Sequence, residues 1–370
     1  MNKKIIAVVY GGCSVEHEIS LISAESIIKN IDRDVFDVFP VYINKSGTWS
    51  KGRLDNLSEL KNRTDGQSTY LIPSLSIHET PKFYEIQNDQ IVNSYDFDLA
   101  FPVLHGTFGE DGTVQGLFEL MGVPYVGASV LGSSVGMDKI IMKSVLRNSD
   151  LPVVDFLGFN NSQWIDEKED IVAEILKSIQ LPCFVKSADL GSSVGITKVE
   201  EEGDIVEAVE FSGKFSDRIL VEKAVSNCRE LEVSVLGNDE PEASLPGEIV
   251  PKREFYDYKA KYDDESTGLI IPADLEEKLV AKMKNYATEA FKVLSCSGMG
   301  RIDFLMDDIS KEIFISEINT IPGFTSISMY PKLWEVSGIK YPELIKKLIS
   351  LAFEKYNSNK KLEKSYDKSI

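Results

Sequence analysis

Four polar residues near the carboxyl end of the chain could together hold a metal ion and stabilise an anion. Asp303 lies in "GRIDFLMD", and Glu317 and Asn319 lie in "EINTIPG". Both stretches are typical of strands, where residues two apart share a face, so Glu317 and Asn319 point the same way. Two carboxylates and an amide oxygen suit Mg²⁺, a hard cation that also contacts phosphates. Arg301 precedes Asp303 and would stabilise an oxyanion, while the apolar neighbours disfavour the alternative of a solvated sheet face.

Two other stretches could contact a nucleotide. "VKSADLGSSVG" places Lys186 at a strand end before a Gly-Ser-Ser loop, whose backbone N–H groups and hydroxyls could reach phosphate oxygens. "ILVEKAV" carries Glu222 and Lys223 on a strand whose backbone could face a purine edge. Each signal is weak alone, because a plain hairpin turn or an exposed strand end looks the same, and the Walker A sequence is absent.

A third candidate is the glycine turn "GGCSVEHEIS", which follows the apolar run "KIIAVVY". A phosphate cradle is not predicted here, because Glu16 sits where phosphate would be repelled. The dipole at a helix start favours an ionised Glu16, and Ser14 is the predicted N-cap of that helix. His17 is interpreted as a residue of the helix surface.

The elements that would position these residues alternate between strands and helices, which predicts an α/β fold. Apolar runs predict strands at 4–10, 35–43, 97–106, 218–225 and 229–237, and a strand–loop–strand unit at 181–199. "GMGRIDFLMD" and "KEIFISEINT" are predicted to pair across the turn "DDISKE". The end of the chain predicts an amphipathic helix with Leu344, Leu348 and Leu351 on one face. Residues 45–92 are polar and rich in turn formers, so we interpret them as an insertion on the first domain.

The bulk composition excludes several classes of protein. The chain has 370 residues, a net charge of −19 and a pI near 4.7, which argues against general nucleic-acid binding. No apolar run is long enough for a membrane span, and the N-terminal run is too short for a signal peptide. We therefore expect no membrane partner and a cytoplasmic location. The four scattered cysteines support no zinc ribbon or disulfide framework and are expected to be buried free thiols.

In combination, seven motifs resemble those of the D-alanine–D-alanine ligases of the ATP-grasp superfamily, from about residue 4 to residue 355. They are "GGCSVEHEIS", "LHGTFGEDGTVQG", "GMDK", "FVKSADLGSSVG", "EFYDYKAKY", "GRIDFLMD" and "EINTIPGFTSISMYPKLWEVSG". The resemblance implies an ATP-grasp fold of three domains: a Rossmann-like N-terminal domain (1–127, with the insertion at about 45–92), a small central α/β domain (128–218) and a C-terminal α+β domain (219–360). It also implies a mobile loop at about 251–270, followed at the end of the chain by a polar tail (361–370). Ser187 stands where the family usually has a proline.

The resemblance also implies the ATP and metal sites. ATP would lie between the central and C-terminal units. Its implied contacts are Lys139, Lys186, Ser193 and Lys261 for the phosphates, Glu222, Lys223 and Val225 for adenine, and Glu230 for the ribose. Asp303, Glu317 and Asn319 would bind two Mg²⁺ ions, for which Mn²⁺ could substitute.

The amino-acid substrates have implied partners as well. Glu16 would bind the ammonium of the first D-alanine, and Ser192 and Tyr262 would bond with Glu16 and tie the loop to it. His105 would lie near the first carboxylate. Arg301 and the amide of Gly323 would form an oxyanion hole. Ser328 would bind the carboxylate of the second substrate, and Met329 would line its side-chain pocket.

The implied reaction is the ligation of two D-alanines to D-alanyl-D-alanine through a D-alanyl phosphate, with release of ADP and phosphate, for peptidoglycan precursors. Tyr262 and Met329 favour D-alanine over D-lactate or D-serine as second substrate, and D-alanine–D-serine or D-alanine–D-lactate ligation is the alternative. The resemblance implies a homodimer. A dehydrogenase would need GxGxxG after the first strand, which is missing, and a non-catalytic ATP-binding module predicts losses among Arg301 and the metal set, all of which are present.

Overall fold

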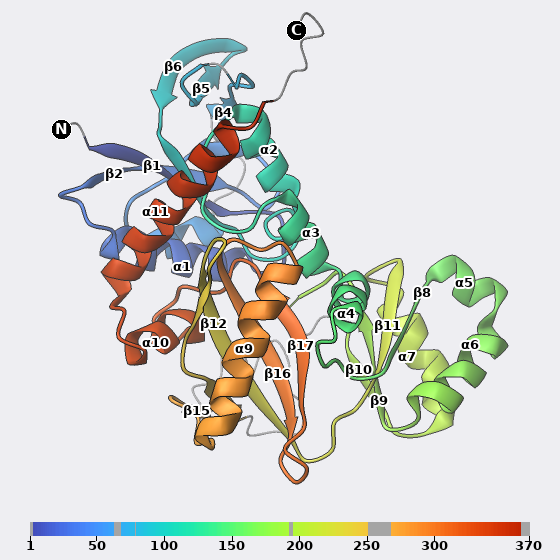
Figure 1. The fold of residues 1–370 in the computed structure, drawn as a ribbon. Coiled ribbons are helices and arrows are strands. Elements are labelled where there is room, and N and C mark those ends of the chain that lie inside the picture. Colours follow the sequence, from blue (N-terminus) through green and yellow to red (C-terminus); the bar gives the residue numbers. More distant parts are fainter. Residues whose placement is uncertain (1–2, 63–67, 78, 192–194, 251–267, 364–370) are drawn as a thin grey trace, which may run out of the picture.

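The computed structural model describes residues 3–62, 68–77, 79–191, 195–250 and 268–363. The chain forms three parts: an N-terminal part in blue and teal, a central part in green and a C-terminal part in yellow and orange (Figure 1). Within the described residues, no helix has the length and apolar character needed to cross a membrane.

The N-terminal part is built on a sheet with strand order β3-β2-β1-β7. Its members are β1 (Lys4–Gly11), β2 (Phe36–Ile43), β3 (Trp49–Lys51) and β7 (Leu99–Val103). β1 runs parallel to β2 and β7, which confirms the predicted strands. Alternate residues of β1 are buried on opposite faces, against α1 (His17–Asn30) and α2 (Thr113–Met121). Burial on both faces explains why β1 reads as a continuous apolar run.

Residues 45–92 contain strands that their composition did not indicate. β4 (Tyr70–Pro73), β5 (Lys82–Gln87) and β6 (Gln90–Asp96) form an antiparallel sheet. Phe83 attaches this sheet to the N-terminal core, because it is fully buried and stacks on Phe97 with 5.1 Å between ring centroids. The side chains of β6 are exposed on both faces. The alternation of apolar and polar residues that predicts a half-buried strand is therefore missing there.

The central part is an antiparallel sheet with order β10-β9-β11-β8. Its strands are β8 (Phe156–Asn160), β9 (Cys183–Ser187), β10 (Thr197–Val199) and β11 (Arg218–Lys223). The predicted strand–loop–strand unit is confirmed, since β9 and β10 pair. One face packs against α5 (Asn161–Asp166), α6 (Lys168–Glu174) and α7 (Ile205–Ser212). The other face carries Lys186 and Glu222 and faces α4 (Lys139–Asn148).

The C-terminal part is a sheet with order β15-β14-β12-β16-β17, and β13 (Glu242–Ala243) pairs with β12. The other strands are β12 (Cys228–Gly237), β14 (Gly247–Val250), β15 (Gly268–Ile270), β16 (Gly298–Asp307) and β17 (Ile313–Asn319). β16 and β17 pair across a turn as predicted. Apolar residues of this sheet pack against α9 (Glu277–Val293) and α4. The opposite face carries the polar side chains of Glu232, Arg301 and Asp303, which register places next to one another.

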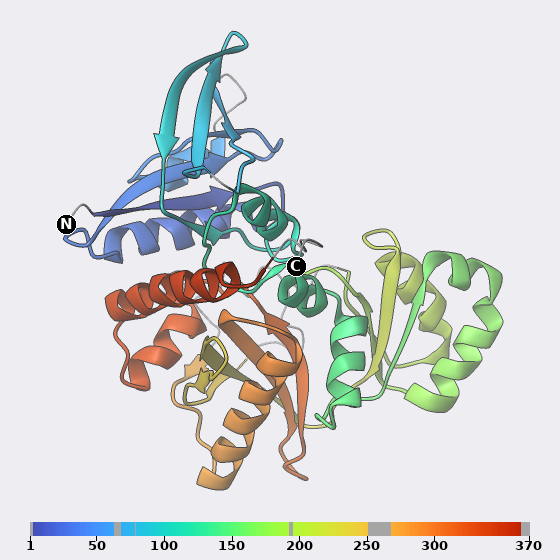
Figure 2. The ribbon, with the colours of Figure 1, turned by 45° about the horizontal axis from the view of Figure 1, so that its top comes forward.

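The last two helices join the C-terminal part to the N-terminal part. α10 (Met329–Val336) and α11 (Tyr341–Lys360) contribute Tyr330, Leu344 and Leu348 to the core that contains Ile6 and Val8 of β1. Figures 1 and 2 show α11 lying between α1 and the C-terminal part. The predicted amphipathic helix is confirmed, with Leu344 and Leu348 fully buried and Leu351 partly buried.

Three local predictions were wrong. His17 is fully buried rather than on the helix surface; its Nδ1 donates to Gly12 O (2.6 Å) and its Nε2 lies 3.4 Å from the hydroxyl of Tyr42. Ser14 is not the N-cap, because Glu16 holds that position and Ser14 Oγ donates to His105 O (2.6 Å). The cysteines are all free, but only Cys183 and Cys296 are buried, whereas Cys13 and Cys228 are exposed.

Candidate functional site

The polar face of the C-terminal sheet carries two rows of functional side chains. The register places Glu232, Asp303 and Glu317 side by side on β12, β16 and β17. It places Ser234, Arg301 and Asn319 in the adjacent row. Cross-strand neighbours on one face lie within side-chain contact, so the predicted cluster of Arg301, Asp303, Glu317 and Asn319 is brought together by strand pairing.

Arg301 is the centre of this cluster. Its guanidinium donates to both oxygens of Asp303, with Nε–Oδ1 and Nη2–Oδ2 distances of 2.7 Å. The Nε atom also lies 3.0 Å from Glu232 Oε2. Burial opposes the charge of Arg301, but the carboxylates of Asp303 and Glu232 outweigh it and raise the pKa well above its usual value. Arg301 is therefore a fixed, permanently charged group, and Glu232 is a neighbour that sequence reasoning missed.

The oxygen atoms beside Arg301 fit a hard divalent cation. Asn319 Nδ2 donates to Asp303 Oδ2 (3.0 Å), which leaves the amide oxygen of Asn319 as a further donor beside the carboxylates. Among the described residues, no three His, Cys, Asp or Glu side chains converge on one metal position. The oxygen donors are thus two carboxylates and one amide. Such donors suit Mg²⁺, whose remaining coordination positions phosphate oxygens would fill.

Lys139 connects this cluster to the loop before β10. Its Nζ lies 3.4 Å from Glu317 Oε2 and donates to Leu190 O (2.7 Å). Lys139 begins α4, whose N-cap Asp138 accepts from Ile140 N and Ile141 N. The ordered cap fixes the direction in which Lys139 leaves the helix.

The polar face of the central sheet holds a buried charge cluster around Glu222. Its Oε1 is paired with Lys186 Nζ, and its Oε2 lies 3.2 Å from Lys143 Nζ. Burial raises the pKa of Glu222, but the two lysines outweigh burial and lower it to about 2. Burial lowers the pKa of Lys143, with Glu222 opposing that shift. Sequence reasoning missed Lys143. It lies four residues after Lys139, on the same face of α4.

The remaining nucleotide residues lie at the end of this sheet. Lys223 is exposed at the end of β11, whereas Val225 and Glu230 are half-buried beyond it. Ser187 is buried where a proline was expected, and its hydroxyl donates to Ser212 O (3.0 Å), which anchors the strand end. The predicted residues Ser192, Ser193, Lys261 and Tyr262 lie outside the described residues.

Glu16 reaches the same site from the N-terminal part. It is buried and, with Gly106, Lys139, Glu317 and Asn319, lines a cavity of about 40 Å³. At Gly191, an added Cβ would lie 3.4 Å from Glu16 Oε2, so the loop before residue 192 also meets Glu16. All three parts of the molecule therefore converge on one small cavity.

His105 links the N-terminal part to the segment after β17. Its Nδ1 lies 3.0 Å from Ile321 O, and its Nε2 lies 3.1 Å from Ser23 Oγ. Since a carbonyl only accepts, Nδ1 carries the proton. Burial lowers the pKa of His105, with Glu16 opposing that shift, which favours the neutral ring.

Glu110 makes a parallel link and was missed as a site residue, although its motif was recognised. Its two oxygens accept from Gly106 N (2.8 Å) and Ile321 N (2.9 Å), and it lines the cavity beside Glu16. Burial and the nearby Glu16 raise the pKa of Glu110 to about 7. A carboxylate five residues after His105 in a glycine-rich loop was the available signal.

The segment after β17 also presents Gly323, Ser328 and Met329. Gly323 is close to Ser328, because an added Cβ would lie 2.8 Å from Ser328 Oγ. Ser328 Oγ accepts from Thr325 N (3.0 Å) and occupies the N-cap position of α10. Met329 is buried against Ile249. The positive end of α10 at Ser328 is suited to a carboxylate.

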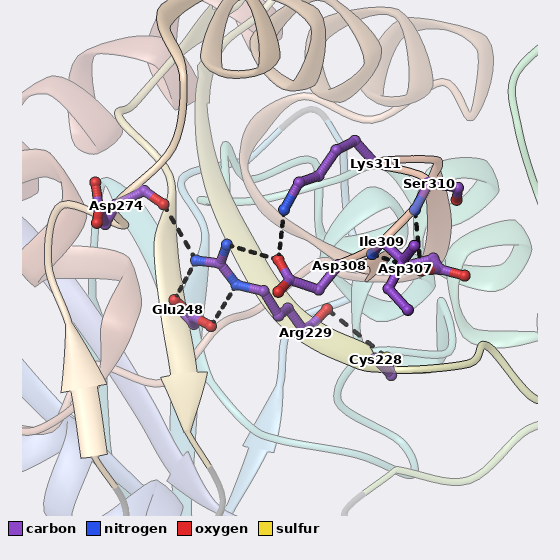
Figure 3. A network of polar contacts seen from close by, with 9 residues as sticks. All are labelled: Cys228, Arg229, Glu248, Asp274, Asp307, Asp308, Ile309, Ser310 and Lys311. Atoms are coloured by element: carbon purple, nitrogen blue, oxygen red, sulfur yellow. Dashed lines mark hydrogen bonds and ion pairs between the residues drawn. The ribbon is translucent and has the colours of Figure 1, made fainter.

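A second charge network surrounds Arg229 near the start of β12 (Figure 3). Arg229 forms two parallel hydrogen bonds with Glu248, at 2.7 Å and 2.6 Å, and lies 3.3 Å from Asp308. Lys311 donates to the same Asp308 (2.7 Å). This network joins β12, β14 and the β16–β17 turn beside Glu230.

Comparison with known proteins gives a consistent result along the whole chain. Family models described as D-ala D-ala ligase N-terminus and C-terminus match residues 5–128 and 145–350. A D-alanine–D-alanine ligase of Natranaerobius thermophilus is 45% identical over 352 residues, 95% of each chain. The solved structure of the D-alanine–D-alanine ligase from Coxiella burnetii matches with a TM-score of 0.85 at 36% identity, covering 98% of this chain and 97% of the other. The VanG D-Ala:D-Ser ligase of Enterococcus faecalis matches with a TM-score of 0.84 at 34% identity, covering 95% and 100%.

Proposed function

The chain belongs to the D-alanine–D-alanine ligase family, whose members join two D-alanines at the expense of ATP, and we propose that its reaction centre is the cavity shared by Glu16, Lys139, Glu317 and Asn319. The chain is an ATP-dependent ligase with the ATP-grasp fold. Its product serves peptidoglycan synthesis. The convergence of all three parts on that cavity is the observation that carries the proposal.

ATP occupies the space between the polar faces of the central and C-terminal sheets. Lys139 and Lys186 contact its phosphates, Glu222, Lys223 and the backbone at Val225 hold adenine, and Glu230 holds the ribose. The Glu222–Lys186 pair supports this assignment, because it keeps the lysine charged and directed along the sheet face. The predictions for Ser193 and Lys261 belong to the same proposal.

Asp303, Glu317 and Asn319 hold two Mg²⁺ ions, for which Mn²⁺ can substitute. Bound Mg²⁺ supplies positive charge that offsets the repulsion between phosphates and an anionic nucleophile. The chain prepares this site itself, because Arg301 holds Asp303 in a two-point contact and Lys139 holds Glu317.

The first D-alanine binds between the N-terminal part and the cavity. Its ammonium pairs with Glu16, and its carboxylate lies near His105. The neutral His105 ring is held by Ile321 and Ser23, so it positions this subsite without adding a charge. Ser192 and Tyr262 are assigned to bond with Glu16.

The reaction proceeds in two steps. A carboxylate oxygen of the first D-alanine attacks the γ-phosphorus of ATP and displaces ADP, giving D-alanyl phosphate. The amine of the second D-alanine then attacks the acyl carbon, a proton leaves the amine, and phosphate departs. Arg301 and the amide of Gly323 stabilise the oxyanion of the tetrahedral intermediate, and Arg301 is suited to this because its neighbours fix its position.

The second D-alanine binds with its carboxylate at Ser328 and its methyl group at Met329. The helix start at Ser328 supports the first contact, and the buried Met329 supports the second, because it offers no partner to a hydroxyl. An apolar pocket rejects an added hydroxyl only by about a hundredfold, so D-serine is a weak alternative substrate. We further assign a cytoplasmic location and a homodimer.

The test is phosphate release with ATP and Mg²⁺ in three mixtures: D-alanine alone, D-alanine with D-serine, and D-alanine with D-lactate, with the products separated. D-alanyl-D-alanine from D-alanine alone supports the proposal. If product formed only when D-serine or D-lactate was added, the ligase chemistry would stand. The assignment of Met329 to the pocket for the D-alanine methyl group would then be overturned. No phosphate release from folded protein in any mixture would overturn the ligase.

A further inference from the structure

Lys143 is a buried charged residue that has no part in the reaction described above. Its side chain on α4 is fully buried, although lysine is almost never fully buried without a partner. Its Nζ lies 3.2 Å from Glu222 Oε2 and 3.5 Å from Ile315 O. Lys143 therefore links β11 of the central sheet to β17 of the C-terminal sheet, the two sheets between which ATP is placed.

The backbone that carries Lys143 is anchored to both sheets. Asp138, the N-cap of α4, is paired with Arg218 at the start of β11, where its Oδ1 accepts from Nη2 at 3.3 Å. Lys143 meets Glu222 near the other end of that strand. Arg218 and Glu222 are four residues apart on a strand, so they share the face that α4 covers. On the other side of α4, Leu146 is buried in the core of the C-terminal sheet.

Glu222 keeps acceptor capacity after its contacts with the two lysines. Its Oε1 is paired with Lys186 Nζ. No hydrogen bond from the described residues reaches its buried Oε2, which Lys143 approaches as an ion pair. The pKa of Glu222 is about 2, so the carboxylate is ionised and only accepts. A buried acceptor of this kind is suited to an N–H donor from a ligand.

The ionised carboxylate of Glu222 distinguishes between purines. Adenine carries an amino group at position 6, which donates a hydrogen bond, whereas guanine carries an oxygen there, which only accepts. Glu222 therefore attracts the first and repels the second. Phe156 and Phe184 are its cross-strand neighbours on the same sheet face, so aromatic side chains flank the position where a purine would meet the carboxylate.

We propose that Lys143 is a positioning residue, which holds Glu222 Oε2 where it accepts from the 6-amino group of adenine and so makes the ligase selective for ATP. The inference rests on the proposed placement of adenine at Glu222 and adds the residue that orients this carboxylate. Without Lys143, the carboxylate keeps Lys186 as its one cationic partner and is drawn toward it. A hydrogen bond weakens steeply when its angle is poor, so the displaced carboxylate loses selectivity while it stays ionised.

The test compares ATP with purine riboside 5′-triphosphate, which lacks only the 6-amino group, in D-alanine-dependent phosphate release with Mg²⁺. The wild type is expected to prefer ATP at least about tenfold in kcat/KM, the effect of one hydrogen bond to a charged group. Lys143→Met removes the ammonium group and should bring this preference below about threefold, because a misaligned hydrogen bond contributes little. The change should come from a higher KM for ATP, with the KM for D-alanine unchanged.

The matched control is Leu146→Ala, which disturbs the packing of α4 at a fully buried position three residues after Lys143. It should lower the unfolding free energy and leave the preference between the two nucleotides as in the wild type. A merely structural role for Lys143 would likewise lower activity with both nucleotides equally. An unchanged preference in Lys143→Met therefore overturns the inference.

A second comparison uses Glu222→Gln with and without Lys143→Met. The double variant leaves neither member of the ion pair buried without its partner, so this comparison stays decisive even where Lys143→Met alone fails to fold. Both proteins should show the same preference, because Lys143 acts through Glu222, and a further loss in the double variant would contradict that.

Two results with the wild type separate the inference from the proposed function. Ligation of D-alanine with both nucleotides at equal kcat/KM would overturn the contact of Glu222 with the 6-amino group and leave the ligase intact. No phosphate release with either nucleotide would overturn the ligase, and the inference with it.

Discussion

At the scale of single residues, the site depends on charges that neighbouring charges hold in place. Arg301 is fixed by Asp303 and Glu232, and Lys186 is fixed by Glu222. Such pairs cost desolvation energy when buried, and they contribute here by presenting charged groups without reorganisation during the reaction. Residues assigned to substrate contacts are thus inseparable from the partners that orient them.

The first prediction concerns Glu317. Glu317→Gln should lower kcat at least about a hundredfold, because it removes the anionic side chain that we propose as a metal ligand, whose effect would be several kcal/mol. Thermal unfolding should be nearly unchanged, since Glu317 is half-exposed on the polar sheet face. Glu312→Gln, on the exposed turn before β17, is the matched control. Full activity of Glu317→Gln would remove this residue from the metal site.

The second prediction follows from Glu110, whose pKa is raised from 4.5 to about 7 by burial and by Glu16. A raised pKa means that the folded state binds the proton more tightly than the unfolded state. Protonation of Glu110 therefore stabilises the folded state fully below pH 4.5, and this stabilisation is lost as the pH rises through 7. The wild type should therefore lose up to about 3 kcal/mol of unfolding free energy relative to Glu110→Gln across this range.

Urea unfolding of the ligand-free protein at pH 5 to 8 measures this difference. Glu119→Gln, at an exposed position of α2, serves as the control and should follow the wild type. Parallel pH profiles for the wild type and Glu110→Gln would contradict the assigned ionisation of Glu110.

One cluster of the candidate site could be predicted from residue types and spacing, whereas the other substrate and nucleotide roles were implied by the family resemblance. Arg301, Asp303, Glu317 and Asn319 were found because strand alternation places them on one face, and the register confirms that geometry. Glu232 and Lys143 were missed because their role depends on which strand or helix lies opposite, and local sequence does not show that. His17 was misassigned because its burial depends on Gly12, which follows β1, and on Tyr42 of β2.

At the scale of elements, sheet register aligns the chemistry. The ladder between β16 and β17 has a bulge between Asp303 and Phe304. On one side of the bulge, Glu317 pairs with Asp303 and Asn319 pairs with Arg301. On the other side, the register of β17 is shifted. Bulges are common where a side chain must be re-aimed beside an active site. The pairing of β16 with β17 was predictable from the turn between them, whereas this register shift has no clear mark in the sequence.

A third prediction tests the network of Figure 3, in which Arg229 joins β12, β14 and the β16–β17 turn. Arg229→Met should cost about 2 kcal/mol of unfolding free energy, because Glu248 is left buried without its two-point partner. The double variant Arg229→Met with Glu248→Met should lose less than the sum of the single variants. A double-mutant cycle by urea unfolding gives this coupling, and strictly additive effects would contradict the proposed role of the pair.

At the scale of the whole molecule, the helix at the end of the chain joins the C-terminal part to the N-terminal part. α11 belongs by sequence to the C-terminal part, yet its apolar face packs into the core of the first sheet. The amphipathic pattern predicted the helix and its buried face, but the pattern could not indicate which sheet would receive it. The same limit applies to β4, β5 and β6, whose place on the N-terminal core depends on contacts such as Phe83 with Phe97.

The fourth prediction follows from that shared core. Leu348→Ala should lower the unfolding free energy by about 2 to 5 kcal/mol, as expected for a fully buried leucine. Because α11 joins the N-terminal and C-terminal parts, both should lose stability together. Lys347→Ala, on the exposed side of α11, is the control. Hydrogen exchange that rises in α1 and α10 alike would support the prediction, and a change confined to α11 would contradict it.

The central claim is that the carboxylate of the first D-alanine attacks ATP within the cavity between the three parts. Its most direct test uses D-alanine labelled with ¹⁸O in both carboxylate oxygens, with ATP and Mg²⁺, and mass analysis of the released phosphate. The account predicts one ¹⁸O atom in each phosphate, because the oxygen that bonds to phosphorus leaves with it when the second amine attacks. Unlabelled phosphate, released together with dipeptide, would contradict the acyl-phosphate route and the roles assigned to Glu16 and Arg301.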